Sequence, residues 1–185
     1  ALSTAHWLEE QSILPESCLI FNSLPLYHVS GLMPWWRSRC WKAKHIWLDP
    51  KLMHDPLKLQ KKYHTLIKSH TGPILTSLVP TQLIRLIKHP LGIRWLKMFS
   101  VIWVGGSTIP KNLLKTSKKL NLRLAPCYGT TETTAMVAVQ TPQNFLSSRQ
   151  SAGIALNDVE FRLGEQNALQ IKTTRLAKVI EKDGT

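Results

Sequence analysis

The stretch Tyr128–Thr134, YGTTETT, places four threonines around a single carboxylate, that of Glu132. A threonine hydroxyl can donate a hydrogen bond to a phosphate oxygen, and glutamate supplies the oxygen ligands that Mg²⁺ prefers when it also bridges to substrate phosphates. The ring of Tyr128 could stack on a purine base. The same composition is common in polar turns, where threonines cap helices and bond to the local main chain. The run is therefore a candidate nucleotide site that needs support from elsewhere in the chain.

Two further stretches hold residues of similar character. In VGGSTIP, Gly105 and Gly106 follow an apolar run, and they would let a ligand approach the backbone or would permit a positive φ. In LPLYHVSG, His28 stands between an aromatic and a small residue, where a histidine is either structural or catalytic. No GxxxxGK and no GxGxxG pattern occurs, so the two most familiar phosphate-binding loops are excluded.

The elements that position these stretches alternate between strand and helix patterns. Residues 1–11 resemble the end of a helix. Strands are predicted at 18–26, 45–49, 74–79, 98–106 and 123–129, and helices after Pro34 and at 55–70, 80–89 and 110–120. This alternation predicts an α/β fold with a mostly parallel sheet and flanking helices. Later stretches, 134–141, 158–163 and 168–174, lack long helices between them, so a few smaller antiparallel strands are expected. We interpret residues 1–135 as the α/β core and 136–185 as its β-rich continuation in the same domain.

Each chemically suggestive stretch follows a predicted strand. These stretches are Pro25–Gly31, Gly105–Pro110 and Tyr128–Thr134. In open α/β sheets, ligands bind beyond the carboxyl ends of the strands. We therefore expect the three stretches to meet at one edge of the sheet, and their shared position is stronger support for a site than any one alone.

The charge balance favours anionic partners. The 185 residues are 43% hydrophobic, as in folded proteins, and 24 Lys and Arg face 11 Asp and Glu, giving a net charge of +13. Nucleotides, phosphate, nucleic acid and acidic membranes all fit such a charge, while a solvated basic face is the plainest reading.

Cysteine spacing and hydropathy argue against disulfide-rich, zinc-binding and membrane-spanning proteins. Three widely spaced cysteines without a CxxC pair indicate neither a disulfide framework nor a zinc site, and the histidines lack metal-ligand spacing. A reducing cytoplasm is the simplest location. No apolar run approaches the roughly 18 residues of a membrane span, and no signal peptide is visible.

Taken in order, LPLYHVSG, SLVPTQLIRLI, VGGSTIP and YGTTET resemble the adenylate-forming acyl-CoA synthetases, and YGTTE looks like their YGxTE motif. Arg37 follows His28 by nine residues, and SLVPTQL comes later. These features narrow the resemblance to the o-succinylbenzoate–CoA ligases of menaquinone and phylloquinone biosynthesis. The resemblance covers about residues 21–163, most of the chain.

The resemblance implies ATP-dependent adenylation of an acid, followed by transfer of the acyl group to CoA. Carried over by motif, Thr131 would contact the α-phosphate and Glu132 would hold Mg²⁺. Tyr128 and Gly129 would line the nucleotide pocket, with Tyr128 near the adenine. Together with His28, Thr131 and Glu132 would form the catalytic set.

The resemblance also implies an acyl site. Gly105, Gly106 and Ser107 would form a strip between the adenine and the acyl group, and His28 would sit beside the carboxylate that is activated. Arg37 would pair with a second carboxylate of the acid, because a planar guanidinium suits bidentate carboxylate recognition. Its plain alternative is an exposed helical arginine.

Several parts of the family pattern are missing. The chain has no Gly/Ser/Thr-rich phosphate loop of the type TSGTTGxPK, no recognisable ribose-binding Asp, and no C-terminal domain with its catalytic Lys. We therefore expect the central part of the large N-terminal domain, with little or no ligase activity on its own. The oligomeric state is open.

Three alternatives stay open at this point. Another aryl- or acyl-CoA ligase would have no need of a buried Arg37. A basic nucleic-acid-binding module would fit the charge and seven tryptophans, although no RNP, KH or helix-turn-helix pattern is found. A non-catalytic relic of the fold is the third, against which the intact Thr131–Glu132 pair argues.

Overall fold

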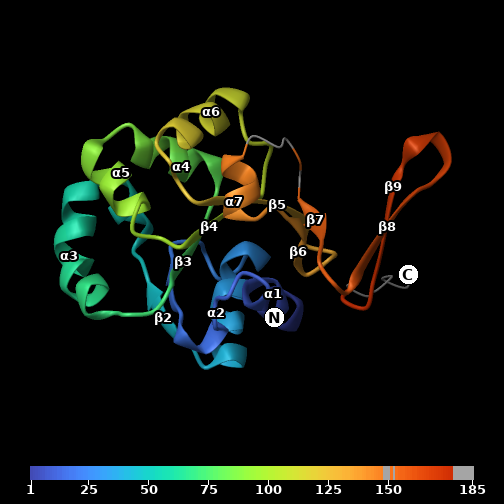
Figure 1. The fold of residues 1–185 in the computed structure, drawn as a ribbon, viewed down its shortest axis with the longest axis horizontal. Helices are drawn as coiled ribbons and strands as arrows, with labels where there is room; N and C mark the ends of the chain where they lie inside the picture. Colours follow the sequence, from blue (N-terminus) through green and yellow to red (C-terminus); the bar gives the residue numbers. More distant parts are fainter. Residues whose placement is uncertain (148–150, 152, 177–185) are drawn as a thin grey trace, which may run out of the picture.

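The computed structural model describes residues 1–147, 151 and 153–176. Within them, the main sheet has seven strands in the order β2-β1-β3-β4-β5-β6-β7 (Figure 1). The strands are β1 (Leu19–Asn22), β2 (Lys44–Trp47), β3 (Ile74–Leu78), β4 (Val101–Val104), β5 (Leu124–Thr130), β6 (Ala135–Val139) and β7 (Ile154–Ala155). The first five pair in parallel, whereas β6 pairs antiparallel with both β5 and β7. The predicted α/β class with a mostly parallel sheet is confirmed.

Proline starts most of the helices that cover the sheet. The described helices are α1 (Leu2–Glu9), α2 (Val29–Trp41), α3 (Pro56–Ser69), α4 (Pro80–Ile87), α5 (Pro90–Leu96), α6 (Lys111–Lys119) and α7 (Pro142–Leu146), with 3₁₀ turns at Pro15–Ser17, Pro50–His54 and Glu165–Asn167. Proline is the first residue of α3, α4, α5 and α7, where a missing N–H costs no hydrogen bond. Asp55 caps α3 by accepting a hydrogen bond from the Lys58 amide at 3.0 Å.

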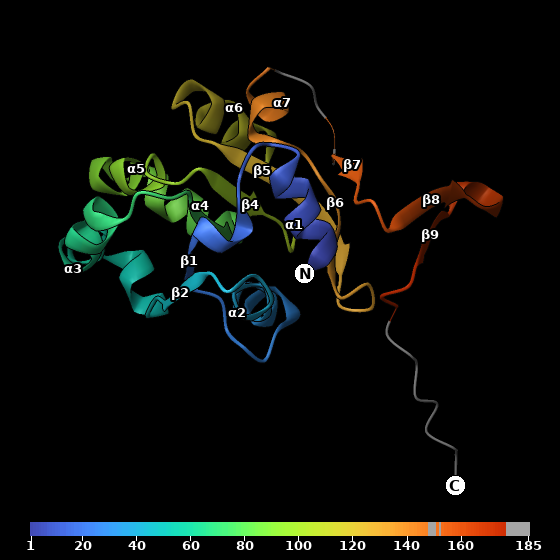
Figure 2. The same ribbon diagram turned by 60° about the horizontal axis from the view of Figure 1, so that its bottom comes forward.

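The helices form two layers, one on each face of the sheet (Figure 2). On one face, α3–α7 bury a core in which Phe21 meets Tyr63, Trp95 and Phe99 edge to face. On the other face, α1 and α2 cover a second core that contains Trp103. Alternate side chains of each strand therefore pack into one core or the other. Because both faces of the sheet are buried, the strands read as continuous apolar runs.

Some boundaries differ from the sequence prediction. Helix α2 begins at Val29, so Pro34 lies inside it rather than at its start. The burial of Met33, Arg37 and Trp41, spaced by four residues, outweighs the one hydrogen bond that Pro34 cannot make. Strand β4 begins three residues later than predicted, and α5 forms where no element was predicted.

The smaller antiparallel strands expected near the C-terminal end are present. Strands β8 (Val159–Leu163) and β9 (Leu169–Thr173) form an antiparallel hairpin that stands away from the main sheet (Figure 1). Among the described residues, no helix has both the length and the apolar character that crossing a bilayer requires.

Candidate functional site

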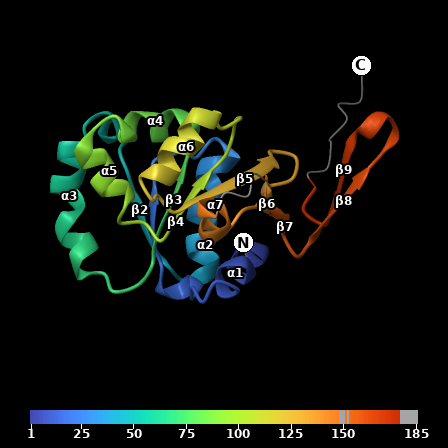
Figure 3. The same ribbon diagram turned by 45° about the horizontal axis from the view of Figure 1, so that its top comes forward.

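The three predicted stretches meet at one edge of the sheet. Strands β1, β3, β4 and β5 run in parallel, so their carboxyl ends lie side by side (Figure 3). The segments that follow β1 and β4, together with the end of β5, enclose a first cavity of about 410 Å³. Its walls include His28, Arg37, Gly105, Gly106, Tyr128, Gly129, Thr131 and Glu132. Of the predicted site residues, only Ser107 lies outside this lining.

Two glycines in the lining are required by the backbone. A Cβ at Gly129 would lie 1.8 Å from the Ala135 carbonyl oxygen, because β5 and β6 approach closely at an irregularity in their register. Gly106 has φ 83°, in the left-handed region that residues with a Cβ seldom adopt. The sequence reading of a positive φ in the paired glycines thus applies to Gly106.

The segment that carries His28 is held from below by a buried asparagine. The Asn22 side chain, 0% exposed, donates from Nδ2 to the Gly31 carbonyl at 2.8 Å and accepts from the Leu24 amide at 3.1 Å. These two bonds close the loop between β1 and α2. His28 occupies the N-cap position of α2, and its ring is exposed beside that of Tyr27, with 4.6 Å between centroids. The imidazole therefore stands at the rim of the first cavity.

Arg37 is a cation inside the cavity wall. It is 5% exposed, and its guanidinium lies 5.4 Å from the centroid of the Trp103 ring. Its Nε has no hydrogen-bond partner, and no carboxylate of the described residues forms an ion pair with it. Burial lowers the pKa of Arg37 to about 10, so the side chain still carries its charge at neutral pH. A buried cation without a partner is suited to an anionic ligand.

The Thr131–Glu132 segment is a tight, exposed turn between β5 and β6. Strand β5 continues through Thr130, so the first part of the motif is strand rather than loop. The buried Thr133 hydroxyl accepts from the Thr130 amide at 3.0 Å and donates to the Ala135 carbonyl at 2.9 Å. A hydrogen bond from the Thr130 side chain lowers the pKa of Glu132, with a further contribution from the main chain. Glu132 is therefore ionised at neutral pH and faces solvent.

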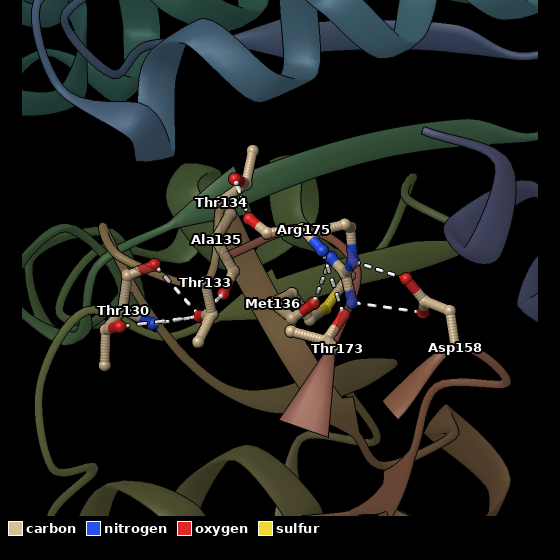
Figure 4. A network of polar contacts seen from close by, with 8 residues as sticks. All are labelled: Thr130, Thr133, Thr134, Ala135, Met136, Asp158, Thr173 and Arg175. Carbon is tan, nitrogen blue, oxygen red and sulfur yellow. Dashed lines mark hydrogen bonds and ion pairs between the residues drawn. The ribbon is translucent and has the colours of Figure 1, made fainter. Parts of the chain in front are cut away.

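A second arginine braces this turn from the hairpin side (Figure 4). Thr134 and Ala135 have positive φ angles of 52° and 80°, which strain residues with a Cβ. The Thr134 hydroxyl donates to the Arg175 carbonyl at 2.8 Å, and the Arg175 guanidinium donates to the Met136 carbonyl at 3.0 Å. The same guanidinium pairs with Asp158. The hairpin end is thereby fastened behind the candidate phosphate-binding turn.

A second cavity, of about 650 Å³, adjoins the first. Gly106, Cys127, Tyr128 and Gly129 line both cavities. Gly105 faces only the first cavity and Ser107 only the second, so the predicted strip Gly105–Ser107 lies along the boundary.

A family model described as AMP-binding enzyme matches residues 2–174. The chain belongs to the AMP-binding enzyme family. It is 29% identical over 150 residues to the 2-succinylbenzoate–CoA ligase of Oceanobacillus iheyensis. The aligned region covers 80% of this chain and 30% of that ligase. The chain is also 26% identical over 167 residues to the indoleacetate–CoA ligase of Aromatoleum aromaticum, covering 87% of this chain and 30% of that ligase.

The fold matches that of a solved CoA synthetase. The o-succinylbenzoate CoA synthetase of Bacillus subtilis, in complex with the acyl-adenylate intermediate OSB-AMP, has a TM-score of 0.71 at 21% identity, over 95% of this chain and 35% of the synthetase. That synthetase is also known in complex with ATP and a magnesium ion. At this identity the likeness establishes the shared fold. The chain spans about a third of the length of these relatives.

The oxygen donors around Glu132 fit magnesium in an AMP-binding enzyme. An ionised carboxylate and the neighbouring threonine hydroxyls are hard donors, as Mg²⁺ prefers. No group of three or more His, Cys, Asp or Glu side chains in the described part of the chain could hold a metal ion. A metal at Glu132 would therefore take its other ligands from substrate phosphates and water.

Sequence reasoning missed several residues that shape the site. Trp103 lies under Arg37, and its signal was its position two residues before Gly105 on an alternating strand. Asn22 could have been suspected as a polar residue at the end of an apolar run. No local pattern marks Arg175, because its partners are 17 and 39 residues away in the sequence.

Proposed function

We propose that this chain is the central part of the adenylating domain of an AMP-forming acid–thiol ligase, and that its acid is o-succinylbenzoate or a related aromatic diacid. The observation that supports the diacid is Arg37, a buried cation without a carboxylate partner in the described residues. It shares the first cavity with His28 and Glu132. A monocarboxylic acid, once activated, would leave this cation without a counter-charge.

The chemistry of such a ligase has two steps. The substrate carboxylate attacks the α-phosphorus of ATP, and the bond to the β-phosphate oxygen breaks as pyrophosphate leaves. The sulfur of CoA then attacks the acyl carbon, the bond to AMP breaks, and the thiol proton passes to solvent. The protein forms no covalent bond in either step, so its role is to position the reactants and offset their charge.

The two cavities divide the substrates between them in this proposal. The acyl group occupies the first cavity, with His28 beside the reacting carboxylate and Arg37 at the second one. The adenine occupies the second cavity against Tyr128, across the strip Gly105–Ser107. Gly129 lets the nucleotide approach the backbone, Thr131 contacts the α-phosphate, and Glu132 holds Mg²⁺. When bound, Mg²⁺ supplies positive charge that offsets the phosphates.

The two segments of the chain form parts of one domain in this proposal. Residues 1–135 act as the α/β core and 136–185 as its β-rich continuation, while a phosphate loop and a catalytic C-terminal domain belong to other parts of the full-length protein. The 185-residue chain alone is then expected to bind ligand without forming a thioester. Its three cysteines are free thiols, in agreement with a cytoplasmic location. If the acid is o-succinylbenzoate, the full-length enzyme acts in menaquinone or phylloquinone biosynthesis.

Calorimetry with a stable o-succinylbenzoyl-adenylate mimic tests the diacid assignment. Arg37→Ala should weaken binding of the mimic by at least about 30-fold, because truncating one partner of a buried charge pair costs about 2 kcal/mol or more. Arg37→Lys keeps the charge but loses the planar fork, and should weaken it less. AMP should bind all forms equally.

Arg39→Ala is the matched control, since Arg39 lies on the same helix and is exposed. It should leave the affinity for the mimic unchanged. Equal loss in the two alanine variants would contradict the proposal.

The indoleacetate–CoA ligase relative makes a monocarboxylate ligase the second candidate. An indoleacetyl-adenylate mimic distinguishes the two, because it lacks the second carboxylate. If the wild-type chain prefers this mimic and Arg37→Ala does not weaken it, the acid is a monocarboxylate.

A further inference from the structure

The net charge of the chain comes from one continuous segment. Residues 56–131 contain thirteen Lys and Arg and no Asp or Glu. Residues 1–55 contain five of each kind, and residues 132–185 contain six of each kind. The excess of +13 is therefore confined to 76 consecutive residues that include α3, α4, α5 and α6.

These basic residues form a layer on one face of the sheet. Helices α3–α6 lie together on the face opposite α1 and α2 (Figures 2 and 3). All thirteen basic residues lie on these helices or on the segments that follow them, and all except the half-buried Lys118 are exposed. We call the outer surface of α3–α6 the basic layer.

The basic layer carries little internal compensation. In the described part of the chain, its single ion pair joins Lys58 to Asp55, 3.1 Å apart and exposed to solvent. Arg123 donates to the Phe99 carbonyl, and Lys62 and Lys118 lie over aromatic rings, but none of these contacts neutralises charge. Like charges on four neighbouring helices repel one another, so a polyanionic surface would stabilise the layer.

The residue types of the layer favour a lipid surface over nucleic acid. The aromatic side chains of α3–α6 and of the segments that join them, Tyr63, Trp95, Phe99 and Trp103, are buried, so the outer surface of these helices has no platform on which bases could stack. The exposed Tyr128 lines the two cavities. Ten of the thirteen cations are lysines, whereas arginine is the residue most used to read base edges. On α3, Leu57 is 62% exposed among lysines, as is typical of helices that rest on anionic membranes.

We propose that the basic layer docks the protein onto the surface of an anionic lipid bilayer. The contact is peripheral and electrostatic, through lysine side chains that reach the headgroup phosphates from several helices at once. Of the thirteen cations, Lys111, Lys115 and Lys118 also line the second cavity, whereas the other ten line neither cavity. The docking that these ten support does not depend on the proposed ligase activity.

Vesicle co-sedimentation of the 185-residue chain tests the docking. The chain should bind phosphatidylcholine vesicles that contain phosphatidylglycerol at about 0.15 M salt, and should not bind pure phosphatidylcholine. High salt should release it. A layer variant removes one exposed lysine near each helix: Lys61→Gln, Lys88→Gln, Lys97→Gln and Lys119→Gln. It should bind at least about tenfold more weakly, given the attraction that each lysine contributes at such a surface.

A control variant makes the same change in net charge elsewhere. It carries Lys44→Gln, Lys51→Gln, Arg162→Gln and Lys172→Gln, all at exposed positions outside the layer. It should keep wild-type affinity for the vesicles, and far-UV circular dichroism checks that both variants are folded. Equal weakening in both variants would overturn the proposal, because net charge rather than the layer would then be responsible. Absence of binding at physiological salt, or tighter binding to a DNA or RNA oligonucleotide than to the vesicles, would also overturn it.

Discussion

Arg37 and Arg175 are both withdrawn from solvent near the candidate site, yet their surroundings are opposite. Arg175 pairs with Asp158 and donates to the Met136 carbonyl, so its charge and both of its terminal nitrogens are used within the protein. Arg37 is more deeply buried and has an aromatic ring beside it, but no carboxylate within the described residues. Arg175 therefore fastens one part of the chain to another, whereas Arg37 faces a cavity.

This difference separates stability from binding. A cation whose partners lie in the protein contributes to folding, and its removal leaves those partners unsatisfied. A buried cation without partners costs folding free energy, which a ligand can return on binding. The lowered pKa of Arg37 agrees with this view: folding disfavours its protonated form, so the cost is present at neutral pH and is relieved only as the pH rises through about 10.

The contrast between Arg37 and Arg175 is tested most directly by replacing each with methionine, an uncharged side chain of similar length. Arg175→Met should lower the free energy of unfolding by about 2–3 kcal/mol, below the range for fully buried pairs because the pair is partly exposed. Arg37→Met should change it by less than about 1 kcal/mol, or raise it, because an uncompensated cation is lost while packing on Trp103 is kept. Urea unfolding of the purified chain measures both.

Adding Asp158→Asn to Arg175→Met supplies the control for this pair. The second change removes the unpaired carboxylate and should restore part of the lost stability. If instead Arg37→Met is the more damaging substitution, then Arg37 has a partner within the protein and the contrast between the arginines is wrong.

The residues around the cavity were easier to predict from the sequence than the bonds that hold them. The strand–helix alternation was enough to bring His28, Gly106 and Tyr128 to one edge, because parallel strands have their carboxyl ends on the same side. The start of α2 was harder to predict, because Pro34 suggested that the helix begins there. In the structure the helix begins at Val29, and the burial of one of its faces compensates for the proline inside it. Fixing the turn at Ala135 depends on Arg175, and such long-range contacts leave no local pattern in a single sequence.

A smaller perturbation tests the turn itself. Thr133→Val keeps the shape of a side chain that is 3% exposed, but it leaves the Thr130 amide and the Ala135 carbonyl without their partner. We expect a loss of about 1–2 kcal/mol in unfolding free energy. Affinity for AMP with Mg²⁺ should also fall, because Glu132 belongs to this turn, whereas Arg37→Met should leave AMP binding intact.

Thr116 on α6 provides the control for Thr133→Val, because its side chain is exposed to solvent. Thr116→Val should change neither stability nor AMP affinity appreciably. An AMP affinity that survives Thr133→Val would show that the hydrogen bonds of Thr133 are not needed to hold Glu132 in place for nucleotide binding.

The reactivity of the Cys127 thiol should report the charge of Arg37, although the expected change is small. Burial raises the pKa of the Cys127 thiol to about 11, while the Arg37 cation acts in the opposite direction. At mildly alkaline pH the thiol is therefore protonated and should react with iodoacetamide far more slowly than the exposed Cys40. In Arg37→Met the pKa should rise further, by less than about one unit, so the alkylation rate at a given pH should fall by less than about tenfold. Mass spectrometry of the labelled peptides against pH measures both rates, and an unchanged rate in the variant would mean that the charge of Arg37 does not reach the boundary between the two cavities.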